Sequence, residues 1–244
     1  RVAVAPAAVG QLHASVHADG DGSWRALPLR GADMPAVHGT LLHPDAARSY
    51  AELFVFALDL SRLEVHAVAG SVEPRRDDAP VDAAARPGVI PSSDRGALVA
   101  AFKGGFKAEH GHYGMMSNGV EWLAPKKHSC TIAAQVDGRL TIAPWTSITD
   151  DSSLSWWRQT PACMVEGGVL HSGLRAEGNR NWGATLEGDT VIRRSAVGLS
   201  DDGKFLFVGI GNSMTAPALA RGMLHAGATQ VAQLDVNFSY PRFL

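Results

Sequence analysis

Residues 194–241 read RSAVGLSDDGKFLFVGIGNSMTAPALARGMLHAGATQVAQLDVNFSYP, and the rest of the chain is interpreted from this stretch. The Asp202-Gly203 pair between two apolar runs predicts a β-hairpin. Thr215 is a suitable N-cap and Pro217 suits the first turn of a helix that Gly227 would end. We therefore expect strand, hairpin turn, strand, short helix and strand. A polar segment, Asp235–Ser239, follows at the end of the last strand and is called the polar outlet below.

The last strand of this stretch carries a carboxylate close to its end. Alternation along a strand predicts that Val231, Gln233 and Asp235 share one face. The Asp235 side chain is then expected to face the same space as Asn237 and Ser239.

A second stretch is expected to meet this outlet. The apolar run 97–102 predicts a strand buried on both faces, and it ends in Lys103-Gly-Gly-Phe-Lys107. Adjacent glycines indicate positive φ or a close backbone approach. If the two strands are neighbours, Lys103–Phe106 and Asp235–Ser239 line one crevice. The amides of Gly104 and Gly105, with Lys103 beside them, could then bind an anion.

The whole chain favours an α+β fold, a mixed and largely antiparallel sheet with a few packed helices. Short strands and hairpin turns recur, as around Asp137-Gly138. We expect a further hairpin from 53–60 and 63–69, and a short helix at 45–52. Residues 1–95 are interpreted as a β-rich lead-in region, part of the same domain as residues 96–244.

Composition excludes some classes of function. The formal net charge is −2, which gives no reason to expect nucleic acid or an anionic membrane as partner. No apolar run reaches the roughly 20 residues of a membrane span. A Gly-x-Ser-x-Gly elbow, a P-loop and a dinucleotide fingerprint are all absent from the sequence.

The cysteines and histidines carry weak signals. Cys130 and Cys163 could form one disulfide or be two buried thiols, and the residues alone favour the thiols. A metal site would have to draw on His110, His112, His128 and Cys130, whose spacing provides no convincing third and fourth ligand. No metal or other cofactor is expected.

Tryptophans offer one more candidate for binding. Exposed Trp156, Trp157 or Trp182 could stack on the apolar face of a sugar ring. Tryptophan side chains are more often part of the core, and packing is the favoured interpretation.

The motifs in these two stretches resemble the phosphodiester glycosidase family, which includes the uncovering enzyme that removes N-acetylglucosamine from a sugar phosphodiester. Ala100-Ala-Phe-Lys-Gly-Gly-Phe106 is similar to the family's strand followed by Asn-Gly-Gly-Phe. The family's order and approximate spacing also recur further on, at Arg194–Gly198, Asp202-Gly203, Thr215, Leu219-Ala220, Gly227-Ala228 and Leu234-Asp235. The chain looks like a divergent member of the bacterial type.

The resemblance implies hydrolysis of a glycosyl phosphodiester or related envelope glycan, with a sugar and a phosphomonoester as products. Asp235 would stabilise the anomeric carbon or activate water, with Glu166 as second choice and His112 as a proton shuttle. Substrate binding would fall to Lys103, Gly104, Gly105, Phe106, Arg194, Thr215 and Asn237.

Two departures from the family keep an alternative open. Lys103 stands where the family has Asn, and Val236-Asn237 replaces Gly-Gly. A non-catalytic domain that binds carbohydrate or an envelope polymer on the same fold would also fit. The resemblance further implies a secreted, periplasmic or cell-envelope protein, acting on a sugar phosphodiester or polysaccharide.

Overall fold

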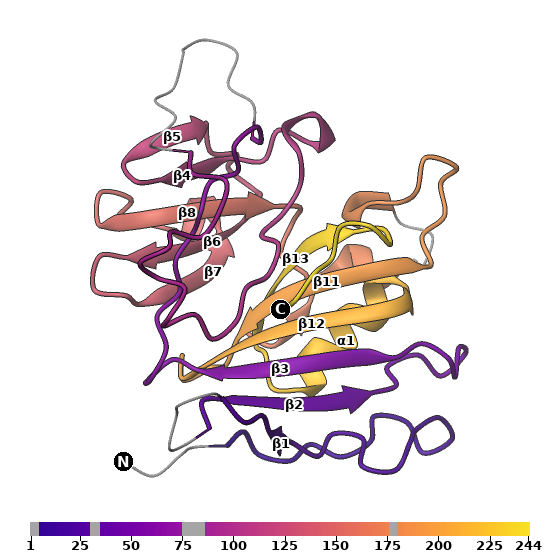
Figure 1. Ribbon diagram of the computed structural model, residues 1–244. Helices are drawn as coiled ribbons and strands as arrows, with labels where there is room; N and C mark the ends of the chain where they lie inside the picture. Colours follow the sequence, from indigo (N-terminus) through magenta and orange to yellow (C-terminus); the bar gives the residue numbers. More distant parts are fainter. Residues whose placement is uncertain (1–4, 30–34, 75–85, 176–179) are drawn as a thin grey trace.

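The computed structural model describes residues 5–29, 35–74, 86–175 and 180–244, and these form two antiparallel sheets (Figure 1). The larger sheet has eight strands in the order β1-β2-β3-β12-β11-β13-β9-β10, and the smaller has five in the order β5-β4-β8-β6-β7. The larger consists of β1 (Arg25–Ala26), β2 (Val37–Leu42), β3 (Leu53–Asp59), β9 (Val165–Glu166), β10 (Val169–Leu170), β11 (Ile192–Leu199), β12 (Phe205–Met214) and β13 (Gln230–Val236). The smaller consists of β4 (Met115–Ser117), β5 (Val120–Leu123), β6 (Cys130–Gln135), β7 (Leu140–Pro144) and β8 (Leu154–Thr160).

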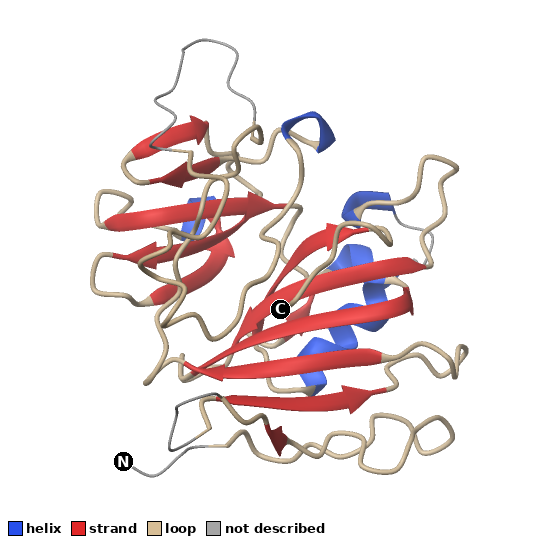
Figure 2. Cartoon of the chain, in the orientation of Figure 1, coloured by secondary structure: helices blue, strands red, loops and turns tan. Residues whose placement is uncertain are grey.

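Helical structure is sparse in the described part of the chain (Figure 2). It consists of one α-helix, α1 (Ala216–His225), and short 3-10 turns at Ala108–His110, Trp145–Ser147, Ser172–Arg175 and Arg180–Trp182. The expected α+β class is wrong, because every described strand pair is antiparallel and the fold is predominantly β.

The predicted succession of strand, hairpin turn, strand, short helix and strand is confirmed as β11, β12, α1 and β13. The β11–β12 hairpin turns at Gly203, whose φ is 68°, and Thr215 caps α1 by accepting a hydrogen bond from the Ala218 amide at 3.2 Å. Alternate side chains of β12 then serve two cores. Phe207 packs on the α1 side, and Val208 packs on the side that faces the smaller sheet.

Three local expectations fail. Residues 45–52 form successive turns, in which Arg48 donates to the Asp45 carbonyl and Ala51 to the Arg48 carbonyl, instead of a helix. Residues 63–69 form no strand, and the 97–102 run contributes only an isolated bridge from Phe102 to Phe243. Its apolar side chains Val99, Ala100 and Phe102 instead pack at the edge of the core between the sheets.

The two cysteines form a disulfide, so the preference for buried thiols is wrong. Cys130 begins β6 and Cys163 lies between β8 and β9, with a Cα–Cα distance of 4.7 Å. Both cysteines are buried in the core that the two sheets share, where packing holds them at bonding distance. In the described residues, no helix combines the length and apolar character of a membrane span.

Candidate functional site

A β-bulge near the end of β13 determines where Asp235 points. Arg194 pairs with Val236 and Ala196 pairs with Gln233, so Leu234 and Asp235 together oppose Ser195. The Ser195 hydroxyl donates to the Asp235 carbonyl at 2.8 Å.

The bulge overturns the expected alternation. Gln233 contacts Arg194 and Trp182 on the α1 side of the sheet. The extra residue turns the Asp235 carboxylate to the other side, toward Lys103 and Arg158. Asp235 and Gln233 therefore do not share a face.

The structure brings Lys103 to Asp235. The chain around Lys103 runs beside the C-terminal tail, since Ala101 and Leu244 exchange two backbone hydrogen bonds and the Lys103 amide donates to the Arg242 carbonyl. This tail directly follows β13, so Lys103 arrives at the end of that strand. Its Nζ atom lies 3.8 Å from Oδ2 of Asp235.

Arg158 closes the site from the smaller sheet. Its guanidinium donates to the carbonyls of Phe106, Tyr113 and Gly114, and burial lowers its pKa to about 10. A Cβ atom on Gly105, whose φ is 140°, would lie 3.3 Å from Arg158 Nε. Glycine at this position therefore lets the loop lie directly against the guanidinium.

Asp235 is 6% exposed, and its Oδ2 atom accepts no hydrogen bond in the described residues. Burial raises its pKa to about 6, although the charges of Lys103, Arg158 and His110 act to lower it. A carboxyl group with a pKa in this range can exchange a proton near neutral pH, which is typical of acid–base groups.

Several hydrogen-bonding groups in the segments next to Lys103 and Asp235 have no partner among the described residues. Within the described ranges, the amides of Gly104 and Gly105 donate to no protein acceptor. Gly104 is exposed, and the Lys103 side chain is half exposed. Buried Oδ1 of Asn237 also has no partner there. Two amides and an ammonium group suit an anion, and the ammonium group lies 3.8 Å from the Asp235 carboxylate.

Arg194 lies outside this group. Its guanidinium donates to the carbonyls of Met214, Trp182, Gly183 and Thr190 and to Oε1 of Gln233. It is fully buried on the α1 side, and burial lowers its pKa to about 10. Its contacts hold the segment that contains Trp182 onto the larger sheet, and they leave no donor for a substrate.

Three other expected residues make no hydrogen bond or ion pair with Asp235 in the described part of the chain. Thr215 is buried and uses its hydroxyl to cap α1. Glu166 is exposed beside Val165, which pairs with Val231 at the start of β13, about 13 Å along the strand from Asp235. His112 is exposed in the loop after Ala108–His110, and its neighbour His110 is the histidine whose charge reaches Asp235.

The Phe106 side chain is part of a small hydrophobic cluster next to the site. It is 8% exposed and clusters with Ile192, Val236 and Tyr113. Sequence reasoning missed Arg158 and Tyr240, whose ring lies 4.7 Å from Lys103 Nζ. It considered His110 only as a metal ligand, whereas the charge of His110 acts on Asp235. Arg158 follows a Trp-Trp pair in an ordinary strand pattern, so no local signal marks it.

The tryptophans and the cysteine that were candidates for sugar or metal binding have structural roles instead. Trp157 and Trp182 are buried, and Trp156 donates its indole N–H to the Val65 carbonyl at 3.0 Å. Cys130 is held in the disulfide and is lost as a ligand. No group of three or more metal-ligating side chains occurs among the described residues.

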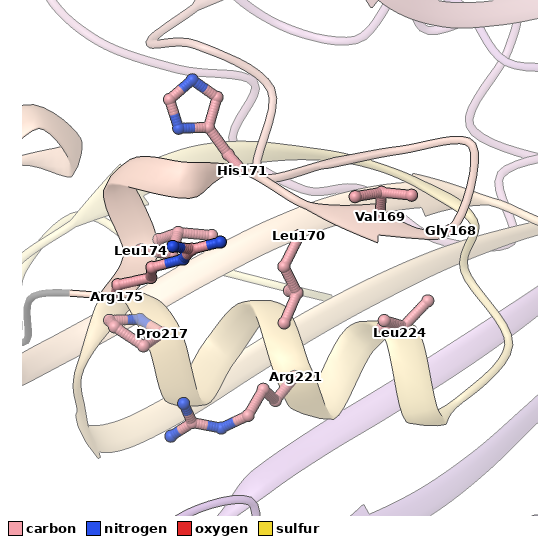
Figure 3. A pocket seen from close by; sticks show the side chains of 9 residues that line it. All are labelled: Gly168, Val169, Leu170, His171, Leu174, Arg175, Pro217, Arg221 and Leu224. Carbon is pink, nitrogen blue, oxygen red and sulfur yellow. The ribbon is translucent and has the colours of Figure 1, made fainter.

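A separate hollow of about 540 Å³ lies between α1 and the β9–β10 hairpin (Figure 3). It is lined by Gly168, Val169, Leu170, His171, Leu174, Arg175, Pro217, Arg221 and Leu224. It belongs to the α1 side of the larger sheet, whereas the Asp235 carboxylate faces the other side. Among the described lining residues none carries a carboxylate, in contrast to the surroundings of Asp235.

Comparisons with known proteins identify no family. No protein-family model and no curated protein matches the chain. A solved structure described as a hypothetical protein from Synechocystis aligns with a TM-score of 0.40 and 10% identity over 91% of this chain. The chain spans 57% of that protein. A "Putative exported protein" from Burkholderia pseudomallei K96243 aligns with a TM-score of 0.37 and 10% identity, over 84% of this chain and 69% of that one.

Proposed function

We propose that this chain is a hydrolase of a glycosyl phosphodiester or a related envelope glycan, and that Asp235 is its acid–base residue. The observation that carries the proposal is the environment of Asp235. Its carboxylate is buried, its Oδ2 atom is without a hydrogen-bond donor in the described residues, and it lies 3.8 Å from the Lys103 ammonium group. The resemblance of the surrounding motifs supplies the substrate class.

The groups beside Asp235 suit a phosphodiester. Lys103 and the unbonded amides of Gly104 and Gly105 offer a positive charge and two donors. Phosphate oxygens are recognised by such combinations of backbone N–H groups and cations. Arg158 donates to three carbonyls and holds this loop in place, so its role is to position the site.

The raised pKa of Asp235 fits a base in this reaction. A phosphomonoester departs as a stable anion, so protonation of the leaving group is less necessary than in ordinary glycosides. Above pH 6 the carboxylate is ionised and can take a proton from water. The water oxygen bonds to the anomeric carbon, the carbon–oxygen bond to phosphate breaks, and its electron pair leaves with the phosphate. Asp235 then releases its proton to solvent.

An exported location belongs to the same proposal. Disulfides persist in oxidising compartments, such as the periplasm and the cell exterior. The Cys130–Cys163 bond is therefore compatible with a protein that meets envelope glycans.

The test is turnover of a panel of sugar-1-phosphodiesters, with release of the phosphomonoester as readout. We expect turnover by the intact protein and a loss of ~10²-fold or more in Asp235→Asn, with substrate binding kept. Glu166→Gln is the matched control, because it removes a carboxylate at the other end of β13, and it should be unaffected. Binding without turnover across the panel would replace the proposal by a non-catalytic carbohydrate-binding role. Turnover that survives in Asp235→Asn would reject Asp235.

A further inference from the structure

The four-residue turn Asn237–Tyr240 presents an aromatic ring beside the candidate site. The Asn237 amide donates to the Arg193 carbonyl at 2.9 Å, and the Tyr240 amide donates to the Asn237 carbonyl at 3.3 Å. Arg242 donates to the Phe238 carbonyl at 3.3 Å. The turn is thus fixed at both ends, while the Phe238 side chain at its tip is 76% exposed.

The surroundings of Phe238 are polar and incompletely bonded. The Arg193 guanidinium lies 5.4 Å from the centre of the Phe238 ring. In the described residues, buried Nε of Arg193 has no acceptor and buried Oδ1 of Asn237 has no donor. Buried polar groups rarely stay unpaired, so a donor and an acceptor next to one exposed ring point to a ligand that meets all three.

A pyranose ring has the required chemistry. Its axial C–H face is apolar and can stack on an aromatic ring, and each hydroxyl both donates and accepts a hydrogen bond. Sugar hydroxyls could therefore accept from Arg193 and donate to Asn237. Asn237 directly follows β13 and is two residues past Asp235, so their Cα atoms lie at most about 7 Å apart and a sugar held at Asn237 is close to the carboxylate.

We infer that the Asn237–Tyr240 turn binds a pyranose unit, stacked on Phe238 and hydrogen-bonded by Asn237 and Arg193. The assignment of this sugar to the substrate rests on the proposed function, but the binding itself does not. Tyr240 belongs to the sugar-binding turn and also borders the proposed phosphate site, since its ring lies 4.7 Å from the Lys103 Nζ atom that would hold the phosphate.

The experiment measures binding of methyl α-hexopyranosides to the intact protein by titration calorimetry and ligand-observed NMR. We expect roughly tenfold weaker binding in Phe238→Ala and retained binding in Phe238→Trp. Asn237→Gly should also bind several-fold more weakly, and glycine accepts the 75° φ of this position without strain. The control is Val136→Ala, which removes an equally exposed apolar side chain (77%) beyond the end of β6.

Two outcomes would overturn the inference. One is a protein that binds none of the pyranosides, and the other is unchanged binding in Phe238→Ala. Asp235→Asn separates this inference from the proposed function, because it should abolish turnover and leave pyranoside binding intact. If pyranosides bind through Phe238 but no phosphodiester is turned over, the sugar subsite stands and the hydrolase proposal fails.

Discussion

The ammonium group of Lys103 lies 3.8 Å from the carboxylate of Asp235, and Lys103 reaches it from the segment that runs beside the C-terminal tail. The Lys103 charge lowers the pKa of Asp235, while burial raises it to about 6. Burial and the opposing charges of Lys103, Arg158 and His110 together set the pH at which Asp235 becomes ionised.

Replacing Lys103 by Gln should move the acidic limb of the kcat/KM profile to higher pH. Loss of the positive charge raises the pKa of Asp235, and a base must be ionised to act. A pH series with a sugar-1-phosphodiester measures the limb. Lys107→Gln is the control, because Lys107 pairs with exposed Glu109 at 3.6 Å. A limb that stays in place or moves to lower pH in Lys103→Gln would contradict this role.

Asp235→Asn should stabilise the folded protein above pH 6. The pKa of Asp235 is raised in the folded state, so the unfolded state binds fewer protons between about pH 4 and 6, and stability falls as pH rises through that window. A shift from 3.8 to about 6 corresponds to roughly 3 kcal/mol at pH 7. Urea unfolding at pH 7.5 and pH 4.5 should show a gain at the higher pH that shrinks at the lower. Equal effects at both would argue against a desolvated carboxylate.

Arg194→Met should destabilise the fold strongly. It would leave the four carbonyls and the Gln233 amide oxygen that Arg194 now bonds without their donor. Buried acceptors that lose a charged donor cost several kcal/mol, and we expect a loss of more than ~3 kcal/mol in urea unfolding. Arg221→Ala, on the partly exposed side of α1, should change stability by less than ~1 kcal/mol. A folded, stable Arg194→Met that fails only in substrate binding would restore the role first expected from the sequence.

The Cys130–Cys163 bond should add stability that grows with the logarithm of the length of the chain segment it closes. The sequence separation is 33 residues, for which the loop-entropy model gives roughly 3–4 kcal/mol. Cys130→Ser/Cys163→Ser should lower the free energy of unfolding by about this amount. The same protein measured under reducing conditions is the comparison, and a variant as stable as the oxidised protein would show that the bond is dispensable.

Local patterns in the sequence correctly predicted the β11–β12 and β6–β7 hairpins and helix α1, but the predicted hairpin of 53–60 with 63–69 and the predicted helix at 45–52 are wrong. Asp202-Gly203 and Thr215 specify their turn and cap through neighbours a few residues away, so they can be read from the sequence. Apolar runs give less information. The 97–102 run looked like a buried strand, yet its side chains pack between the sheets while its backbone makes only one bridge. The sequence does not show whether an apolar run pairs through its backbone in a sheet or only packs through its side chains.

The candidate site was only partly predictable for the same reason. The meeting of Lys103 and Asp235 could be expected, because each follows an apolar run and carries a charge. The side on which Asp235 lies depends on a bulge opposite Ser195 that alternation cannot reveal. Arg158 comes from the other sheet, so only the tertiary fold brings it near the carboxylate.

A carboxyl NMR titration of Asp235, assigned with Asp235→Asn and repeated with added inorganic phosphate, tests the site most directly. We expect a midpoint near pH 6 that rises when phosphate occupies Lys103 and the Gly104 and Gly105 amides, because a nearby anion disfavours the charged carboxylate. A midpoint near pH 4 that phosphate does not move would show a solvated carboxylate with no anion site beside it, and would contradict the proposed function.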